Sequence, residues 1–189
     1  KIMIGSMLDE YQLGLYSSAT TICVLWSFIP EAIINSMRPV IFEKKKINEN
    51  GYMEKLKLLY RIVFWTGIIF CFGICLFSKL IIYILYGKEY LGAQTCLIIA
   101  VWYTLFAYLG TARTVWLVSE GKAKYAKWFT IWGAIINVSL NSFLIPKYGI
   151  NGAAIATLIS QLFAVVITPC LYKNTREFTE ILFKSIARK

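Results

Sequence analysis

Long apolar runs alternate with short polar segments along the whole chain. A run of about twenty apolar residues can cross the ~30 Å hydrocarbon core of a bilayer as an α-helix. The pattern therefore predicts an all-α integral membrane protein with five full transmembrane helices and a truncated first one. The expected spans are residues 1–8 (in part), 16–42, 62–84, 96–118, 128–145 and 150–171. Together they make residues 1–173 one helical membrane lobe, which a tail over residues 174–189 follows.

The last two spans are expected to form a hairpin, because only Pro146-Lys147-Tyr148-Gly149 separates them. Proline cannot continue the first helix, and glycine allows the chain to reverse. Small or short polar residues recur four apart on one face of each arm: Gly152, Ala156, Ser160 and Ala164 on the second arm, and Gly133, Asn137 and Asn141 on the first. Such faces allow two membrane helices to approach closely.

Asn137 and Asn141 should face protein or a water-filled cavity, because an amide in contact with lipid lacks hydrogen-bond partners. The simpler interpretation is that both asparagines bridge neighbouring helices. The alternative is that they line a transport cavity.

Polar residues also share one face of the first full span. Pro30 removes a backbone donor and should kink this helix, which makes Pro30 a candidate hinge. Glu31, Asn35 and Arg38 follow at spacings of four and three, so they lie on the same side of the helix. Glu31 either pairs with an arginine for structural reasons or lines a cavity, whereas Arg38 can extend to the membrane surface.

The charge of the chain is distributed in a way that indicates membrane topology. Lys and Arg number 20 against 10 Asp and Glu, a net charge of +10. The basic residues gather in segments 44–61, 122–127 and from 173 onward, and these alternate with sparsely charged turns near residues 9, 88 and 147. Because basic loops remain in the cytoplasm, the C-terminus is expected to be cytoplasmic. The tail should form an amphipathic helix on that membrane surface.

The sequence offers no catalytic or metal-binding constellation. It contains no histidine, and its five cysteines lie in apolar spans, where cysteine behaves as a small hydrophobic residue. It also lacks a phosphate-binding loop, a GxSxG motif and a carboxylate cluster that could hold Mg²⁺. No metal, cofactor or enzymatic activity is therefore expected. The residues alone indicate a polytopic, transporter-like protein, or a structural membrane partner without transport activity.

Several short motifs point to a known family. They are Gly133-Ala134-x-x-Asn137-x-x-x-Asn141, Leu144-Ile145-Pro146-x-Tyr148-Gly149-x-x-Gly152-Ala153-Ala154, Tyr86-Gly87-x-x-Tyr90, and, near the start, Met3-Ile4-Gly5 and Gly14-Leu15-Tyr16-Ser17-x-Ala19. With these motifs the chain resembles bacterial O-antigen and capsule repeat-unit flippases. These are the Wzx-type polysaccharide transporters of the multidrug/oligosaccharidyl-lipid/polysaccharide exporter superfamily.

The resemblance covers essentially the whole chain and implies the C-terminal lobe of an exporter-type transporter, whose N-terminal lobe is missing. It also implies transport of a polyprenyl-pyrophosphate-linked oligosaccharide across the bacterial inner membrane, by alternating access between two lobes, for surface polysaccharide biosynthesis. The implied partners are the lipid bilayer, the glycan substrate, the N-terminal lobe and other polysaccharide assembly proteins, without nucleic acid.

An anionic pyrophosphate would require basic groups in the cavity. Arg113, with Arg38 at a comparable depth, fits that need, although Arg113 can also extend to the membrane surface. A cation-coupled multidrug exporter of the same fold would instead use an acid within the membrane, and Glu31 keeps that alternative open. The candidate cavity residues are Arg113, Glu31, Asn35, Arg38, Asn137 and Asn141, with Pro30 as the hinge.

Overall fold

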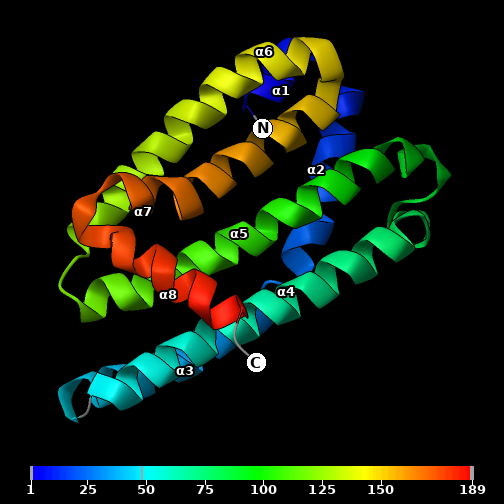
Figure 1. Ribbon diagram of the computed structural model, residues 1–189. Helices are drawn as coiled ribbons and strands as arrows, with labels where there is room; N and C mark the ends of the chain where they lie inside the picture. Colours follow the sequence, from blue (N-terminus) through cyan, green and yellow to red (C-terminus); the bar gives the residue numbers. More distant parts are fainter. Residues whose placement is uncertain (1, 48, 188–189) are drawn as a thin grey trace.

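The computed structural model describes residues 2–47 and 49–187, and these residues form helices with no strand among them. The elements are α1 (Ile2–Met7), α2 (Glu10–Leu25), α3 (Phe28–Ile47), α4 (Glu49–Tyr86), the 3-10 turn η1 (Lys88–Ala93), α5 (Gln94–Ser119), α6 (Lys124–Leu162), the π-helical turn η2 (Phe163–Ile167), α7 (Thr168–Leu171), the 3-10 turn η3 (Lys173–Thr175) and α8 (Arg176–Ala187). Figure 1 shows the long helices running side by side.

Four helical stretches are long and apolar enough to cross a membrane: Glu10–Ile47, Asn50–Tyr86, Lys88–Ser119 and Lys124–Leu171. The fourth stretch reverses direction partway, so its two arms lie next to each other (Figure 1). The predicted class, an all-α membrane protein, is confirmed.

The expected single span over residues 16–42 is in fact two helices, α2 and α3, with a break at Trp26 and Ser27. Proline at position 30 has no N–H that could bond the carbonyl of Trp26 in the α-helical pattern. The backbone there instead forms hydrogen bonds between residues three apart. The N–H of Ser27 bonds the carbonyl of Val24 at 2.9 Å, and the N–H of Ile29 bonds that of Trp26 at 3.1 Å. Pro30 thus lies in the first turn of α3, where a missing donor is tolerated.

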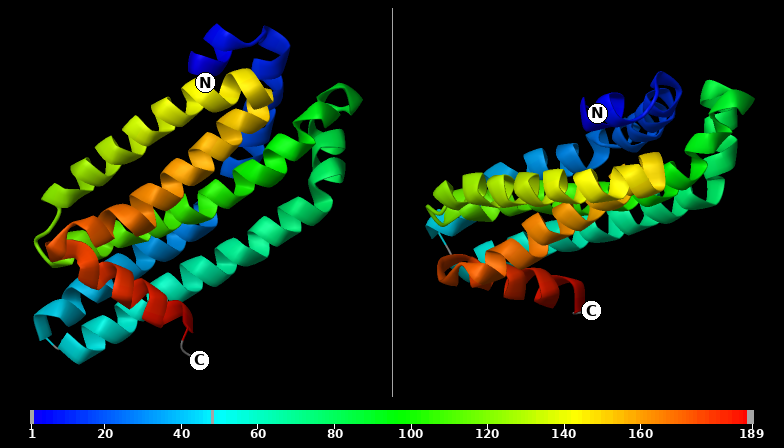
Figure 2. Two further views of the ribbon diagram at one scale, coloured as in Figure 1. Left: turned by 45° about the horizontal axis from the view of Figure 1, so that its top comes forward. Right: turned by 90° about the horizontal axis from the view of Figure 1, so that it is seen from above.

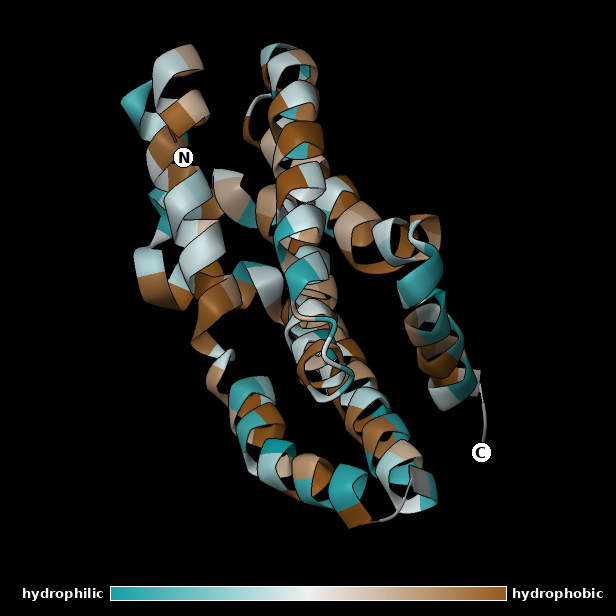
Figure 3. Ribbon diagram, turned by 90° about the vertical axis from the view of Figure 1, so that its left-hand side faces the viewer, coloured by the Kyte–Doolittle hydropathy of each residue, from teal (hydrophilic) through white to brown (hydrophobic). Residues whose placement is uncertain are grey.

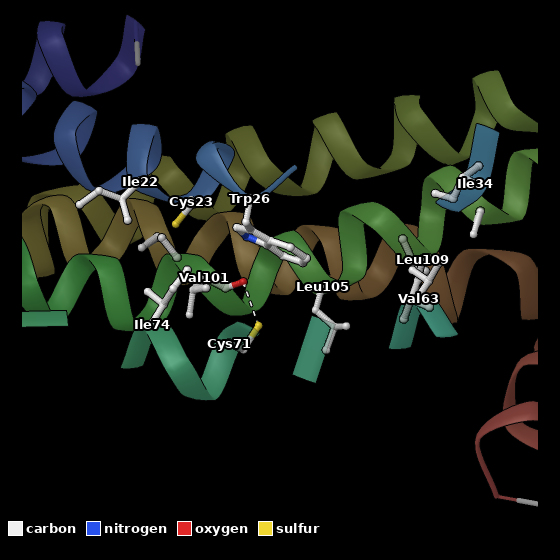
Figure 4. Close-up of a cluster of buried hydrophobic side chains, with 14 of the residues drawn as sticks. Ile22, Cys23, Trp26, Ile34, Val63, Cys71, Ile74, Val101, Leu105 and Leu109 are labelled. Atoms are coloured by element: carbon white, nitrogen blue, oxygen red, sulfur yellow. Dashed lines mark hydrogen bonds between the residues drawn. The ribbon is translucent and has the colours of Figure 1, made fainter. Parts of the chain in front are cut away.

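Trp26 anchors this break in the hydrophobic core (Figure 4). Its ring stacks on Phe70 of α4 at 4.9 Å between ring centres and meets Tyr108 of α5 edge-on at 5.1 Å. Nearby, the thiol of Cys71 donates to the carbonyl of Val101 at 3.4 Å, as the dashed line in Figure 4 marks. The buried cysteines therefore serve packing, and the junction of α2 with α3 is fixed by α4 and α5.

The predicted hairpin is present in α6, but its reversal is shorter than expected. The helix continues through Pro146, and Gly149 alone leaves helical geometry, with φ 56° and ψ −136°. This positive φ favours glycine. Directly after the turn the arms are in close contact, since a Cβ on Gly152 would overlap the carbonyl of Leu144. The small-residue faces read from the sequence do meet between the arms, where a Cβ on Gly133 would lie 3.1 Å from that of Ala164.

The basic residues from Lys44 to Arg61 lie on helices, so the expectation of a long basic loop was wrong. α3 continues to Ile47 and α4 begins at Glu49. At this end of the bundle, Glu120 accepts hydrogen bonds from Lys45 Nζ at 2.7 Å and from the hydroxyl of Tyr52 at 2.9 Å. Burial acts to raise the pKa of Glu120, but these two bonds and the positive charges of Lys45 and Lys122 together hold the pKa below its ordinary value. The network joins the ends of α3, α4 and α5.

The tail helix α8 is amphipathic as predicted, but its apolar face packs on protein. Its hydrophilic and hydrophobic residues fall on different sides, as Figure 3 shows. The apolar residues Phe178, Ile181 and Leu182 are buried, and α8 crosses obliquely against α4 (Figures 1 and 2). The expectation of a helix resting on the lipid surface is therefore corrected, because the bundle offers aromatic side chains that cover this face.

Candidate functional site

A pocket of about 540 Å³, with both polar and apolar side chains in its wall, lies between α5, the two arms of α6 and the π-helical turn η2. Two of the candidate cavity residues, Arg113 and Asn137, line it. Further hydroxyl and amide groups in its wall come from Thr111, Thr114, Thr130, Thr157, Ser160 and Gln161. Polar side chains are costly against lipid, so their concentration within apolar helices makes this pocket the candidate site.

Arg113 points into the bundle from α5, with only 7% of its surface exposed. Its Nη1 donates to the carbonyl of Ala164 at 2.8 Å and to that of Val165 at 3.4 Å. Its guanidinium carbon lies 4.4 Å from the centre of the Phe129 ring, a cation–π contact. Within the described part of the chain, no carboxylate forms an ion pair with it. Arg113 thus brings an uncompensated positive charge to the pocket, in preference to extending to the membrane surface.

The hydrogen bond from Arg113 to the carbonyl of Ala164 takes the place of a missing backbone hydrogen bond in the helix. At the π-helical turn the N–H of Thr168 bonds the carbonyl of Phe163, and the next residue, Pro169, has no N–H. The carbonyl of Ala164 therefore has no helical donor, and an unpaired carbonyl within a membrane costs several kcal/mol. The guanidinium supplies the missing donor, which fixes its position in the pocket wall.

Asn137 and Asn141 connect the arms of α6. The Nδ2 of Asn137 donates to the hydroxyls of Ser160 at 3.1 Å and Thr157 at 3.4 Å. The Nδ2 of Asn141 donates to the Oδ1 of Asn137 at 2.9 Å. The bridging interpretation describes these contacts, and Asn137 also faces the pocket while the buried Asn141 lies outside its lining.

The polar face of α3 lies apart from this pocket. Glu31 and Asn35 are exposed and Arg38 is half-exposed, and α3 packs on α4 and α5. None of the three lines the pocket, and none forms an ion pair within residues 2–47 and 49–187. The six candidates therefore form two separate groups, one at the pocket and one on α3.

Sequence reasoning missed the residues that hold Arg113 in place. Phe129 and Ala164 are apolar, so nothing in their chemistry marks them. The available signal was Pro169 near the end of the last span, because a proline frees a carbonyl four or five residues earlier. The geometry of the neighbouring helix was needed to show that Arg113 reaches that carbonyl.

The fold and the pocket define the class as an all-α membrane protein with a positively charged pocket, lined by hydroxyls and amides, between its helices. The profile of the family described as polysaccharide biosynthesis protein matches residues 1–95. The chain belongs to that family.

Two relatives are similar to almost the whole chain. Capsular polysaccharide biosynthesis protein CapF of Staphylococcus aureus is 25% identical over 180 residues, which cover 92% of this chain and 44% of CapF. The probable low-salt glycan biosynthesis flippase Agl15 of Haloferax volcanii is 27% identical over 171 residues, which cover 86% of this chain and 34% of Agl15. The chain therefore spans less than half the length of either relative. No solved structure matches it.

Proposed function

We propose that this chain is the C-terminal lobe of a flippase that moves a polyprenyl-pyrophosphate-linked oligosaccharide across the bacterial inner membrane. The observation that carries the proposal is the pocket at Arg113, where a buried guanidinium without a carboxylate partner adjoins a wall of hydroxyls and amides. Hydroxyls and amides suit a glycan, and a guanidinium suits a phosphate oxygen through parallel hydrogen bonds. Membership of the polysaccharide biosynthesis family supports the same direction.

Transport takes place by alternating access between this lobe and a second helical lobe. The exposed polar face of α3, with Glu31, Asn35 and Arg38, is directed toward the cavity between the lobes, because contact with lipid would leave these groups unpaired. The break at Trp26 and Ser27 beside Pro30 gives α3 a place to flex during the cycle. The substrate headgroup passes through this cavity while the polyprenyl tail remains in lipid.

A cation-coupled multidrug exporter is the second candidate, and one observation favours it. Glu31 is an exposed carboxylate on an apolar helix with no ion-pair partner among the described residues, and such an acid can bind Na⁺ or H⁺. Against it stands the uncompensated charge of Arg113, which repels cations from the pocket. Neither candidate gives the chain an enzymatic reaction.

The proposed orientation places the C-terminus in the cytoplasm. The basic end of α3 and the starts of α6 and α8 lie toward one end of the bundle, and the turns between α1 and α2, between α4 and η1, and within α6 lie at the other (Figure 1). Under the positive-inside rule the first end is cytoplasmic. Cysteines introduced at Gln12, Leu91 and Lys147 should react with an impermeant maleimide in intact cells, and one at Ala123 should not. The inverse labelling pattern would contradict this orientation.

The function is tested by producing the complete protein in a bacterial strain that lacks its own repeat-unit flippase. Surface glycan should return, and it should be absent when Arg113 is replaced by Ala in a protein that still reaches the membrane. An Arg38→Ala variant serves as the matched control for loss of an arginine outside the pocket. Normal membrane levels of the unaltered protein without any surface glycan, tested with several lipid-linked glycans, would refute the proposal.

A further inference from the structure

The tail helix α8 contacts the guanidinium of Arg113 through a single aromatic side chain, although no residue of α8 lines the pocket itself. Phe178 is fully buried, and the centre of its ring lies 5.8 Å from the guanidinium carbon of Arg113. The same ring lies 5.5 Å from the ring of Tyr60 on α4 and 5.8 Å from that of Trp116 on α5. Phe178 therefore fills the space where α4, α5 and the guanidinium meet.

Three buried polar atoms around Phe178 have no hydrogen-bond partner among the described residues. They are the Nε of Arg113, the hydroxyl of Tyr60 and the Nε1 of Trp116. All three can donate a hydrogen bond, and buried donors in folded proteins are normally paired, because an unpaired one opposes burial. The docked position of α8 thus keeps three donors dry that water or an anion would satisfy if α8 moved away.

Among the described residues, two polar side-chain contacts join α8 to α4 and to the connection after α5, and two others join it to α7: Arg176 Nε donates to the carbonyl of Cys170 at 2.8 Å, and Cys170 Sγ lies 3.4 Å from Thr179 Oγ1. Near its end, the Nε of Arg61 donates to the carbonyl of Ser185 at 3.0 Å. Near its start, the Nζ of Lys122 lies 3.6 Å from the Oε2 of Glu177, an ion pair with a largely exposed carboxylate. Such exposed pairs contribute little to stability. Burial of Ile181 and Leu182 favours docking of α8. Burial of the three unpaired donors opposes it.

The connection to the bundle allows α8 to pivot. The helix before it changes to π-helical geometry at η2, contains Pro169, and ends at Tyr172 in an extended conformation with φ −98° and ψ 117°. This irregular segment lies between the second arm of α6, which lines the pocket, and α8. A rotation there would break the contacts of α8 with Tyr60, Arg61 and Trp116 while the backbones of α4 and α5 stay in place.

We propose that α8 is a movable cover over the Arg113 site, with Phe178 as the group that seals it. When α8 is docked, Phe178 covers the guanidinium of Arg113 on the side that faces α8. When α8 swings away, the donors of Arg113, Tyr60 and Trp116 become accessible together to an anionic phosphate group. The role of this opening in loading substrate rests on the proposed function; the movement itself does not.

A reversible disulfide tests whether the movement is needed. The Sγ of Cys170 on α7 lies 3.4 Å from the Oγ1 of Thr179 on α8, so Thr179→Cys creates a pair that can close under mild oxidation. In the complete protein, reconstituted in proteoliposomes, the oxidised variant should flip a lipid-linked oligosaccharide at least ten times more slowly, and dithiothreitol should restore the rate. Thr179→Cys combined with Cys170→Ser is the control that oxidation should not affect. Equal rates before and after reduction would overturn the role of α8 in transport.

Hydrogen exchange on the same samples tests the movement without relying on transport. Backbone amides of residues 178–185 should exchange at least ten times faster than those of residues 56–60, which the helix packs against, and the disulfide should remove the difference. Lys122→Glu, which sets a like charge against Glu177, should speed exchange in α8, whereas Lys124→Glu in the same connection should not. If α8 is as protected as α4 in every variant, α8 is a fixed part of the bundle and the proposal is wrong. Absence of flipping with fast exchange in α8 would count against the proposed function alone.

Discussion

Arg113 and Arg38 both lie on apolar helices, but the side chain of Arg113 is buried and that of Arg38 is partly exposed. Arg113 is buried in the wall of the pocket, where carbonyls, aromatic rings and small residues fix its guanidinium. Arg38 belongs to the exposed polar face of α3, and neither Arg38 nor Glu31 has an ion-pair partner within the described ranges. A fixed charge suits a preorganised binding site, and an open polar face suits a surface that meets another lobe, water or substrate.

Loss of Arg113 is expected to have the largest effect, because it removes a charge from the pocket and a donor from the carbonyl of Ala164. Arg113→Ala should lower the free energy of unfolding in detergent by about 2–3 kcal/mol and abolish glycan export. Arg113→Lys should recover part of the stability but little export, since an ammonium lacks the planar fork of a guanidinium. Arg38→Ala, the matched change on α3, should alter stability by less than about 0.5 kcal/mol. Equal losses in both variants would abolish the distinction between the two regions.

Replacement of Asn137 should lower the free energy of unfolding by a smaller amount than replacement of Arg113. Asn137→Ala removes the bonds to Ser160 and Thr157 and leaves Asn141 without its acceptor. A decrease of about 1–2 kcal/mol in the free energy of unfolding is expected. Asn35→Ala carries the same chemical change on the exposed face of α3 and should have little effect. Denaturant unfolding of both variants, followed by tryptophan fluorescence, compares them directly, and a larger loss for Asn35→Ala would reverse the assignment.

Pro30 tests the mobility of the exposed region. Pro30→Ala restores a backbone donor for the carbonyl of Trp26, so α2 and α3 should merge into one stiffer helix. Export should fall several-fold while the amount of protein in the membrane stays nearly unchanged. Pro39→Ala, later in the same helix, controls for general effects of proline removal. If export and abundance fall in step, Pro30 has a structural role and the hinge interpretation fails.

The network at Glu120 should give the smallest effect, and one that depends on pH. Its pKa is lower in the folded protein than in the unfolded chain. The contribution of Glu120 to stability is therefore fully present above about pH 4.3, the ordinary value for glutamate, and is lost as the pH falls through the folded pKa. Glu120→Gln should flatten this part of the stability profile between about pH 5 and pH 3. An identical acid profile in the variant would show that Glu120 is not the group responsible.

The hairpin was predictable because it depends on local chemistry. A glycine with positive φ follows a proline between two apolar runs, and residues four apart necessarily share a helix face. The break beside Pro30 was also predictable in kind, although its position at Trp26 and Ser27 follows from the carbonyl of Trp26, which lacks its donor at position 30 and accepts from Ile29 instead. The same local logic could have been applied to Pro169.

The grouping of the candidate residues was not predictable, because it depends on how distant helices pack. The sequence places Arg38 and Arg113 at a comparable depth, but depth along the membrane does not specify which side of the bundle a residue faces. The tail showed the same limit. Its amphipathic pattern is equally compatible with packing on lipid and with packing on an aromatic protein surface. In the structure, α8 packs on the rings of Tyr60 and Trp116, which are distant in the sequence.

The central claim, that this chain belongs to a transporter of lipid-linked glycans, is tested most directly by flipping in vitro. The complete protein is reconstituted in proteoliposomes that contain a fluorescent polyprenyl-pyrophosphate oligosaccharide, and the fraction protected from an impermeant quencher is followed over time. The lipid-linked glycan should exchange between leaflets with the unaltered protein and not with the Arg113→Ala variant, and a lipophilic cationic dye should not be transported. Transport of the dye under a Na⁺ or H⁺ gradient, with no movement of the glycan, would contradict the account and favour the multidrug exporter.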